Sequence, residues 1–311
     1  MNAPVIFLLG PTASGKTNLA CDLAEHFPLE LINVDSASVY RGLDIGTAKP
    51  DAQTRARHPH HLMDWVDPDD PYSAARFVAD VQLLLPEIRA RGRIPLLVGG
   101  TPLYFQALQR GLSTLPAAAP DVRAQLEEEA RVVGWPALHQ RLQEVDPLTA
   151  ARLAPLDRQR IQRALEVWMV TARPLSSWHA EDSKQGLPGP VLTLGLVPGD
   201  RTILHERIAA RFHAMVAAGL EQEVMDLRQR YSLHGDLPAM RAVGYRQAWQ
   251  LLEGELGPSE WVERGIIATR QLAKRQLTWL RSWADLQSID ALAQNCAMRA
   301  QDLVRRFLAP L

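Results

Sequence analysis

The segment Gly10-Pro11-Thr12-Ala13-Ser14-Gly15-Lys16-Thr17 constrains this chain more than any other. It follows the apolar run Val5–Leu9 and precedes a helical pattern over residues 19–23, so the order is strand, glycine-rich loop, helix. In that order the loop N–H groups point inward and the helix N-terminus adds positive potential, which suits phosphate oxygens. Lys16 can then reach a terminal phosphate and Thr17 can ligate Mg²⁺. The segment predicts a diphosphate or polyphosphate site, but not which molecule is bound or which group is transferred.

Three further apolar runs, over residues 29–34, 94–98 and 191–197, have the length and composition of buried strands. A helical pattern over residues 73–90 stands between two of them. Buried strands that alternate with helices are typical of a parallel sheet covered on both faces. The fold class predicted is therefore α/β, with a P-loop NTPase-like parallel sheet flanked by helices.

Polar residues follow two of these strands. Asp35 and Ser36 come directly after the second run, and Gly99-Gly100-Thr101 ends the third. Ligands of open α/β sheets gather outside the carboxyl ends of the strands, so Asp35 and Thr101 are candidates for chemistry. Residues 35–50 have the turn-rich character of a loop that wraps a ligand. Thr101 has an alternative explanation as a helix N-cap, with Pro102 in the first helical position.

The alternation of strands stops between residues 116 and 189, where prolines divide a series of helical segments. We expect a helical insertion domain there, with residues 1–115 and 190–311 forming the core domain and residues 184–190 the returning linker. A helix starting near Asp157 has an arginine-rich first half. Such a face is usually solvated, and contact with an acidic polymer is the alternative.

The C-terminal third is mainly helical and contains two arginine patterns. Arg207 and Arg211 are four residues apart and share a helix face, directed either at a ligand or at Glu206 or Glu223 in a structural ion pair. Residues 264–281 contain five basic residues and no acid. This segment fits contact with a phosphate backbone, although packing of its tryptophan and leucine under snorkelling arginines is possible.

The cluster of His58, His60 and His61 could suggest a metal. No cysteine or carboxylate stands at a familiar zinc spacing, so a structural turn is favoured.

Composition bears on the cellular compartment and on the classes of binding partner that we expect. The chain has 311 residues, 47% hydrophobic and 22% charged, with a net charge of −1, so nothing global indicates nucleic acid. Cys21 and Cys296 are too few for a disulfide scaffold and are expected to be reduced. With no leader pattern and no apolar run that could cross a bilayer, we expect a cytoplasmic protein with no membrane partner.

Several stretches together resemble one family, the bacterial tRNA dimethylallyltransferases. They are the phosphate loop at 10–17, Asp-Ser-Ala at 35–37, the run 40–50 (Tyr-Arg-Gly-Leu-Asp-Ile-Gly-Thr-Ala-Lys-Pro), 97–101, Asp-Arg-Gln-Arg at 157–160, Arg-Ala-Val-Gly-Tyr at 241–245 and 268–276. The phosphate loop alone is shared with many nucleotide-binding, ATP-dependent enzymes, whereas this conjunction in this order is specific. The resemblance implies transfer of a dimethylallyl group from dimethylallyl diphosphate to N6 of adenosine 37, beside the tRNA anticodon.

The resemblance also implies roles for individual residues. Asp35 is the expected general base, Thr101 faces the same reaction channel, and Lys16 stabilises the leaving group. The diphosphate set is Gly10, Pro11, Thr12, Ala13, Ser14, Gly15, Lys16, Thr17 and, through a looser match, Arg211; Mg²⁺ is the expected cofactor, held through Thr17.

The anticodon stem-loop of tRNA is the implied macromolecular partner, gripped by the insert and the basic C-terminal helices, and the protein is expected to be a monomer. The tRNA-binding set implied by the resemblance is Asp35, Ser36, Ala37, Ser38, Thr101, Arg123, Gln159, Arg160, Ile161, Gln162, Arg163, Met240, Arg241, Ala242, Val243, Gly244 and Tyr245.

Three alternatives stand beside this prediction. A small-molecule kinase could use the same loop to move the γ-phosphoryl group of ATP. A prenyltransferase could instead use free AMP or ADP as the acceptor. A P-loop protein that binds RNA without catalysis is the third.

Overall fold

The structure is a computed structural model that describes residues 4–112, 115–181 and 186–309. It divides into two compact units, residues 1–109 with 187–311 and residues 110–186. The sequence predicts the second unit at 116–189, and residues 184 and 185 of its predicted linker lie outside the described residues.

The larger unit is built on a six-stranded sheet, all parallel, in the order β3-β2-β4-β1-β5-β6. Four predicted strands are confirmed as β1 (Val5–Leu9), β2 (Leu29–Val34), β4 (Ile94–Gly99) and β5 (Val191–Val197). The edge strands β3 (His60–His61) and β6 (Gln287–Asp290) are not predicted. They are short and mostly polar, so neither contains the apolar run that marks a buried strand.

The register of the central strands brings three loops to one edge of the sheet. Leu9 at the end of β1 pairs with Gly99 of β4, and Gly99 also pairs with Val34 at the end of β2. The residues that follow these strand ends therefore start level with one another. They are the phosphate loop, the segment that begins at Asp35 and the Gly100 turn.

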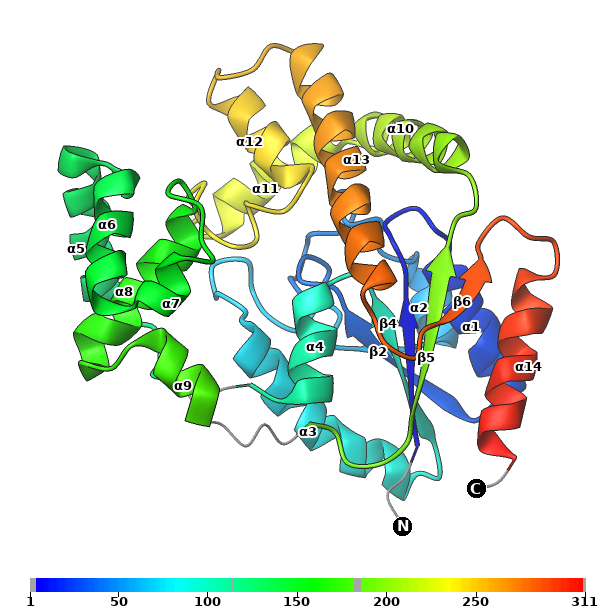
Figure 1. The fold of residues 1–311 in the computed structure, drawn as a ribbon. Helices are drawn as coiled ribbons and strands as arrows, with labels where there is room; N and C mark the ends of the chain where they lie inside the picture. The colour runs from blue at the N-terminus through cyan, green and yellow to red at the C-terminus, as the bar shows by residue number, and fades with distance from the viewer. Residues whose placement is uncertain (1–3, 113–114, 182–185, 310–311) are drawn as a thin grey trace. The chain divides into compact units, whose positions relative to one another are not determined.

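The two faces of the sheet are covered by different helices, as the alternation of side chains along a strand requires. Ile6 and Leu8 of β1 point into a core with α1 (Lys16–His26) and α14 (Cys296–Leu308). Phe7 and Leu9 point into the opposite core with α3 (Ala74–Ala90) and α4 (Pro102–Arg110). Figure 1 shows α1 and α14 on one side of the strands and α3 and α4 on the other.

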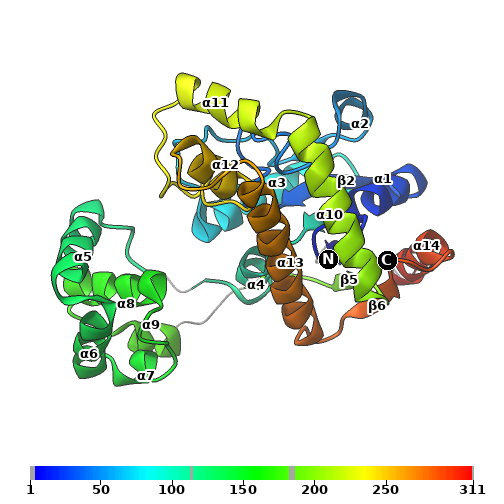
Figure 2. The ribbon, with the colours of Figure 1, turned by 90° about the horizontal axis from the view of Figure 1, so that it is seen from above.

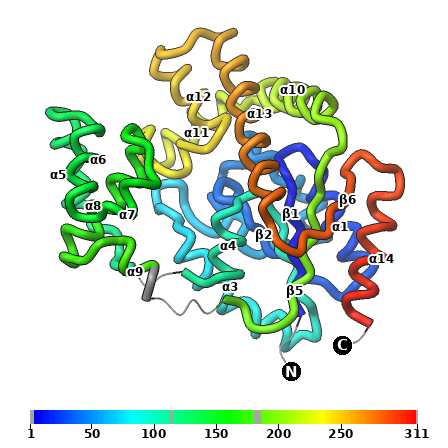
Figure 3. Tube along the Cα trace, viewed as in Figure 1, coloured from blue at the N-terminus to red at the C-terminus, as the bar shows by residue number. Residues whose placement is uncertain are grey.

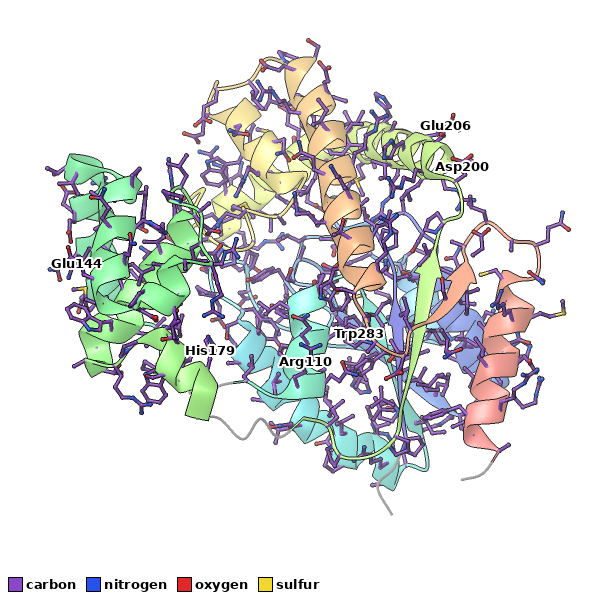
Figure 4. The ribbon with its side chains drawn as sticks, viewed as in Figure 1. Arg110, Glu144, His179, Asp200, Glu206 and Trp283 are labelled. Carbon is purple, nitrogen blue, oxygen red and sulfur yellow. The ribbon has the colours of Figure 1, made fainter. Side chains whose placement is uncertain are left out.

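Further helices of the larger unit join the second core beyond the sheet. They are α10 (Arg201–Ala217), α11 (Leu220–Arg230), α12 (Tyr245–Leu252) and α13 (Glu260–Arg281), and a short α2 (Ala52–Arg57) follows the 35–50 loop. Trp283 follows α13 (Figure 4). Its ring packs edge-on against Phe7 of β1 and Phe105 of α4. The chain then continues through β6 to α14 (Figure 3).

The smaller unit is all helical. Its elements are α5 (Pro120–Val133), α6 (Trp135–Val145), α7 (Pro147–Ala150), α8 (Arg158–Thr171) and α9 (Leu175–Glu181), which group together in Figure 2. Asp157 caps α8 by accepting a hydrogen bond from the Arg160 N–H. The unit has its own core, which includes Leu126, Leu142 and Leu165.

Among the helices that the structure describes, none combines the length and the apolar character needed to cross a bilayer.

The contact between α10 and α13 depends on a glycine. A Cβ at Gly265 would lie 1.9 Å from Cζ of Phe212, the neighbour of Arg211. Gly265→Ala is expected to lower the free energy of unfolding by roughly 1–3 kcal/mol, because the ring must move within a packed core. Chemical denaturation measures this change in the free energy of unfolding. Gly257→Ala is the matched control, since nothing lies within 4 Å of a Cβ there; equal effects of the two variants would contradict the packing argument.

Candidate active site

A cavity of about 450 Å³ opens in the larger unit at the carboxyl ends of the strands. Its walls come from the phosphate loop, the segment after Asp35, the loop at residues 46–51, α10 and α13. Apolar side chains including Ile208, Phe212 and Leu272 share these walls with the polar groups. The cavity is thus a mixed site, with room for charged and apolar parts of a ligand.

The phosphate loop has the backbone that its sequence predicts. Gly15 adopts φ 88° and Ala13 φ 62°, both in the left-handed region, and Lys16 is the first residue of α1. A Cβ at Gly10 would lie 2.8 Å from the Leu196 carbonyl, so this position needs glycine for close approach to β5. The two left-handed residues and the close approach to β5 thus fix the path of the loop.

Lys16, Lys49 and Arg211 line the cavity, and Lys49 is paired with Asp44 and Asp64. Burial lowers the pKa of Lys16 to about 8, an effect that Asp35 opposes and Arg211 reinforces. Burial also lowers the pKa of the Arg211 guanidinium, again opposed by Asp35. Two cations that are partly desolvated near one another favour binding of an anion with more than one negative charge.

The arginine pair on α10 separates in the structure. Arg211 lines the cavity and donates to the Thr47 carbonyl at 3.1 Å, whereas Arg207 is exposed. Of the two carboxylates considered as structural partners, Glu206 is exposed on α10 (Figure 4) and Glu223 accepts hydrogen bonds from the backbone of residues 44–46.

Asp35 lines the same cavity, with its two carboxylate oxygens in different environments. Oδ1 accepts from the N–H groups of Ala37 and Ser38, at 2.9 and 3.3 Å. Oδ2 makes no hydrogen bond to the described residues, so it is available to a ligand. The side chain is thus oriented by one oxygen and able to accept a proton on the other.

Thr101 lies next to this segment, but it is not among the residues that line the cavity. Its Oγ1 accepts from the Ser36 N–H at 3.1 Å, and its own N–H donates to the Val34 carbonyl at 3.3 Å. Thr101 therefore ties the end of β4 to the Asp35 segment.

Two residues without a predicted role, Gln276 and Lys49, also shape the cavity. Gln276 of α13 accepts from the Thr12 N–H at 2.9 Å and donates to the Gly100 carbonyl at 2.7 Å, which joins the phosphate loop to the end of β4. Lys49, whose side chain is only 1% exposed, binds the Tyr40 carbonyl and the carboxylates of Asp44 and Asp64. Both residues belong to stretches that carry the family resemblance, at 268–276 and 40–50, and this membership is the sequence feature that points to them.

Each of the three histidines has a structural partner. His61 Nε2 contacts Glu30 at 2.9 Å, His58 Nε2 contacts Glu25 at 3.2 Å, and His60 Nδ1 bonds the His58 carbonyl at 2.7 Å. Within the described residues no group of histidine, cysteine and carboxylate side chains could hold a metal ion. The cluster belongs to the β3 edge of the sheet.

The phosphate loop still offers oxygens for a cation accompanied by phosphate. Thr17 lines the cavity, and Ser14 Oγ is buried without a hydrogen-bond partner among the described residues. A buried hydroxyl in that condition is one that a ligand can satisfy. This donor set fits Mg²⁺, which usually keeps phosphate oxygens and water as most of its ligands.

Three arginines of the smaller unit that the sequence assigns to tRNA are paired with acids of that unit. Glu166, 0% exposed, accepts from Arg123 at 2.8 Å and from Arg163 at 2.7 Å, and Arg160 pairs with Asp157. Two arginines for one carboxylate leave a net positive charge there. Ile161 is buried in the core of this unit, so its side chain is not available to RNA.

Residues 240–245 of the larger unit have mixed positions. Ala242 and Val243 line the cavity and Arg241 is exposed, while the side chains of Met240 and Tyr245 are fully buried. A ligand could meet the last two only through the backbone. On α13, Lys274 and Arg281 are exposed, as a basic surface requires.

Comparisons with known proteins agree with this geometry. Residues 38–283 match the family described as IPP transferase. The chain is 56% identical over 305 residues to a tRNA dimethylallyltransferase of Thiobacillus denitrificans, covering 98% of this chain and 97% of the relative. A solved full-length tRNA isopentenylpyrophosphate transferase from Bacillus halodurans aligns with TM-score 0.73 and 34% identity, over 100% of this chain and 98% of that one. A eukaryotic dimethylallyltransferase solved acting on tRNA aligns with TM-score 0.83 and 28% identity, over 99% and 80%.

The pKa of Lys16 predicts how diphosphate affinity varies with pH. An anion beside Lys16 favours the protonated amine, so binding takes up a proton once the pH exceeds about 8. The affinity for inorganic diphosphate should then fall with rising pH between 7 and 9.5, by up to about tenfold per pH unit above 8. Calorimetric titration at constant magnesium measures this.

Lys16→Met is the control for the titration of diphosphate itself, which is the same for both proteins. The variant should bind more weakly and show a flatter pH profile. Parallel profiles for the two proteins would contradict the assignment.

Proposed function

The chain belongs to the IPP transferase family, and we propose that it transfers a dimethylallyl group from dimethylallyl diphosphate to N6 of adenosine 37 in tRNA. The observation that carries this proposal is the single cavity in which the phosphate loop, Arg211 and the unengaged oxygen of Asp35 meet. In the reaction the bond between C1 and the diphosphate oxygen breaks, the bond between N6 and C1 forms, and N6 loses a proton. The products are N6-(dimethylallyl)adenosine and diphosphate.

The phosphate loop serves here as a cradle for the leaving group. The loop N–H groups, Lys16 and Arg211 stabilise the negative charge that grows on the departing oxygen, where fixed donors accelerate a reaction most. Mg²⁺ held through Thr17 would neutralise further charge on the diphosphate when bound. This assignment accounts for two partly desolvated cations in one cavity.

Asp35 is the proposed general base. Adenine N6 is a weak nucleophile because its lone pair is delocalised into the ring, so its proton must be accepted as the new bond forms. Oδ2 of Asp35 is the candidate acceptor, since Oδ1 is engaged by Ala37 and Ser38. Thr101 would hold the segment after Asp35 in place through Ser36 rather than touch the reacting atoms.

We assign RNA binding to Arg123, Arg160 and Arg163 of the smaller unit, and to residues 240–245 and α13 of the larger unit. Adenosine 37 must leave its stack to reach the cavity, at a cost of about a few kcal/mol that backbone contacts can offset. Arg123, Arg160 and Arg163 are 43%, 70% and 27% exposed, so each can reach a phosphate while keeping its acidic partner.

The direct test is incubation of the protein with unmodified tRNA, dimethylallyl diphosphate and Mg²⁺, followed by mass analysis of the nucleosides. The proposal predicts a mass gain of one dimethylallyl group at adenosine 37 alone. Modification of free AMP or ADP with tRNA left unchanged would contradict the choice of acceptor. Phosphoryl transfer from ATP without prenyl transfer would contradict the reaction class.

Asp35→Asn separates catalysis from binding. The amide keeps an oxygen for the N–H groups of Ala37 and Ser38 but cannot accept the N6 proton, so turnover should fall by about 10²- to 10⁴-fold. Affinity for the anticodon stem-loop should stay within about twofold, since few RNA contacts are lost. Single-turnover kinetics and a filter-binding titration measure the two quantities.

Asp69→Asn changes an exposed aspartate in the same way and should leave turnover unchanged. Turnover of Asp35→Asn equal to that of Asp69→Asn would remove Asp35 from its role.

A further inference from the structure

The stretch at residues 40–50 carries part of the family resemblance, and the proposed reaction assigns no residue of it a role. Its last five residues, 46–50, form a wall of the cavity. The 40–50 stretch forms hydrogen bonds with α11 and α12, which lie far away in the sequence.

One carboxylate accepts hydrogen bonds from three successive backbone N–H groups of this segment. Glu223 of α11 accepts from the N–H groups of Asp44, Ile45 and Gly46, at 3.1, 2.7 and 3.3 Å. Successive N–H groups that converge on one anion fix the backbone between them, since hydrogen bonds to a charged acceptor are stronger than neutral ones.

Tyr245 completes the anchor. Its hydroxyl donates to Glu223 at 2.5 Å and accepts from the Gly46 N–H at 3.1 Å. The ring packs so closely that a Cβ at Gly46 would lie 2.5 Å from it. Burial, with a further contribution from Glu223, holds the pKa of Tyr245 well above its usual range, so the phenol stays a hydrogen-bond donor.

The next residue of the segment touches the catalytic machinery. The Thr47 carbonyl accepts from Arg211 at 3.1 Å, the one hydrogen bond that this guanidinium makes to the described residues. The rest of its donors remain available to a ligand. Thr47 is adjacent to the residue that Glu223 and Tyr245 both hold, so the direction of the guanidinium depends on the anchored backbone.

We propose that Glu223 is a positioning residue for the donor: by ordering residues 44–46 it places the Thr47 carbonyl, which holds Arg211 toward the diphosphate. Glu223 itself touches no substrate. The inference rests on the proposed function, in which Arg211 binds the leaving group. It assigns a task to the 40–50 stretch and links residues 240–245, through Tyr245, to the diphosphate side of the cavity.

The test measures affinity for inorganic diphosphate with Mg²⁺, and KM for dimethylallyl diphosphate, in full-length protein. Glu223→Gln keeps the shape of the side chain but loses its charge and one acceptor oxygen. We therefore expect the affinity for inorganic diphosphate to fall, and KM for dimethylallyl diphosphate to rise, each roughly tenfold. Affinity for unmodified tRNA should stay within about twofold, because the Tyr245 ring remains packed on Gly46. Glu221→Gln, an exposed acid in the first turn of the same helix, is the matched control and should leave both values unchanged.

A double-mutant cycle separates positioning from general stability. If Glu223 acts through Arg211, Glu223→Gln should weaken diphosphate binding less than about twofold in an Arg211→Ala background. Additive effects, or equal losses of tRNA and diphosphate affinity, would overturn the proposal. Should Glu223→Gln not fold, Tyr245→Phe removes one donor to the same carboxylate and should show a smaller loss with the same dependence on Arg211; full additivity there would also overturn it.

Measurements on the wild-type protein distinguish a failure of this inference from a failure of the proposed function. Wild type that neither binds diphosphate nor prenylates tRNA would contradict both. Wild type that does both, with Glu223→Gln indistinguishable from Glu221→Gln, would contradict the positioning role alone.

Discussion

Lys16 and Arg211 are cations withdrawn from water in a cavity that the carboxylates of Asp35 and Asp51 also line, and burial lowers the pKa of both cations. With Lys49, which also lines the cavity, three cations and two carboxylates leave a net charge of +1 there. The cost of desolvating these charges is offset when an anion binds between the loop amides and the two side chains. Much of the larger unit is arranged to hold these groups in place: α1 begins at Lys16, α10 carries Arg211, and Gln276 of α13 fastens the loop.

The parallel sheet makes this arrangement possible. Because β1, β2 and β4 end in register, the phosphate loop, Asp35 and the Gly100 turn emerge side by side although they are distant in the sequence. The leaving group and the proton acceptor therefore share one edge, and the apolar side chains of α10 and α13 close the space above it. In this account the loop that many enzymes use for phosphoryl transfer holds a diphosphate that departs.

The sequence predicts what is local. Continuous apolar runs identified β1, β2, β4 and β5, and the spacing of Gly10 to Thr17 identified the phosphate loop with the helix that follows. The strands β3 and β6 were missed because two histidines, or a Gln-Ser-Ile-Asp run, become strands only when a neighbouring strand supplies hydrogen bonds.

Contacts between distant residues lay beyond the sequence pattern. Gln276 meets Thr12 across 264 positions and Glu223 meets Ile45 across 178, and no periodicity links such pairs. For the same reason the sequence suggests Glu206 or Glu223 as an ion-pair partner of the α10 arginines, whereas Glu223 accepts hydrogen bonds from backbone amides instead. Burial is also a tertiary property: Ile161 lies within a polar, arginine-rich helix start, yet its side chain belongs to the core of the smaller unit.

On the proposed function the phosphate loop binds a leaving diphosphate, and no nucleoside triphosphate is consumed. The most direct measurement is the amount of diphosphate released per modified adenosine, in a reaction that contains tRNA, dimethylallyl diphosphate and Mg²⁺ but no ATP. We predict equal amounts of diphosphate and modified adenosine, and no change in either when ATP is added. A requirement for ATP, or release of phosphate from ATP in step with modification, would contradict it.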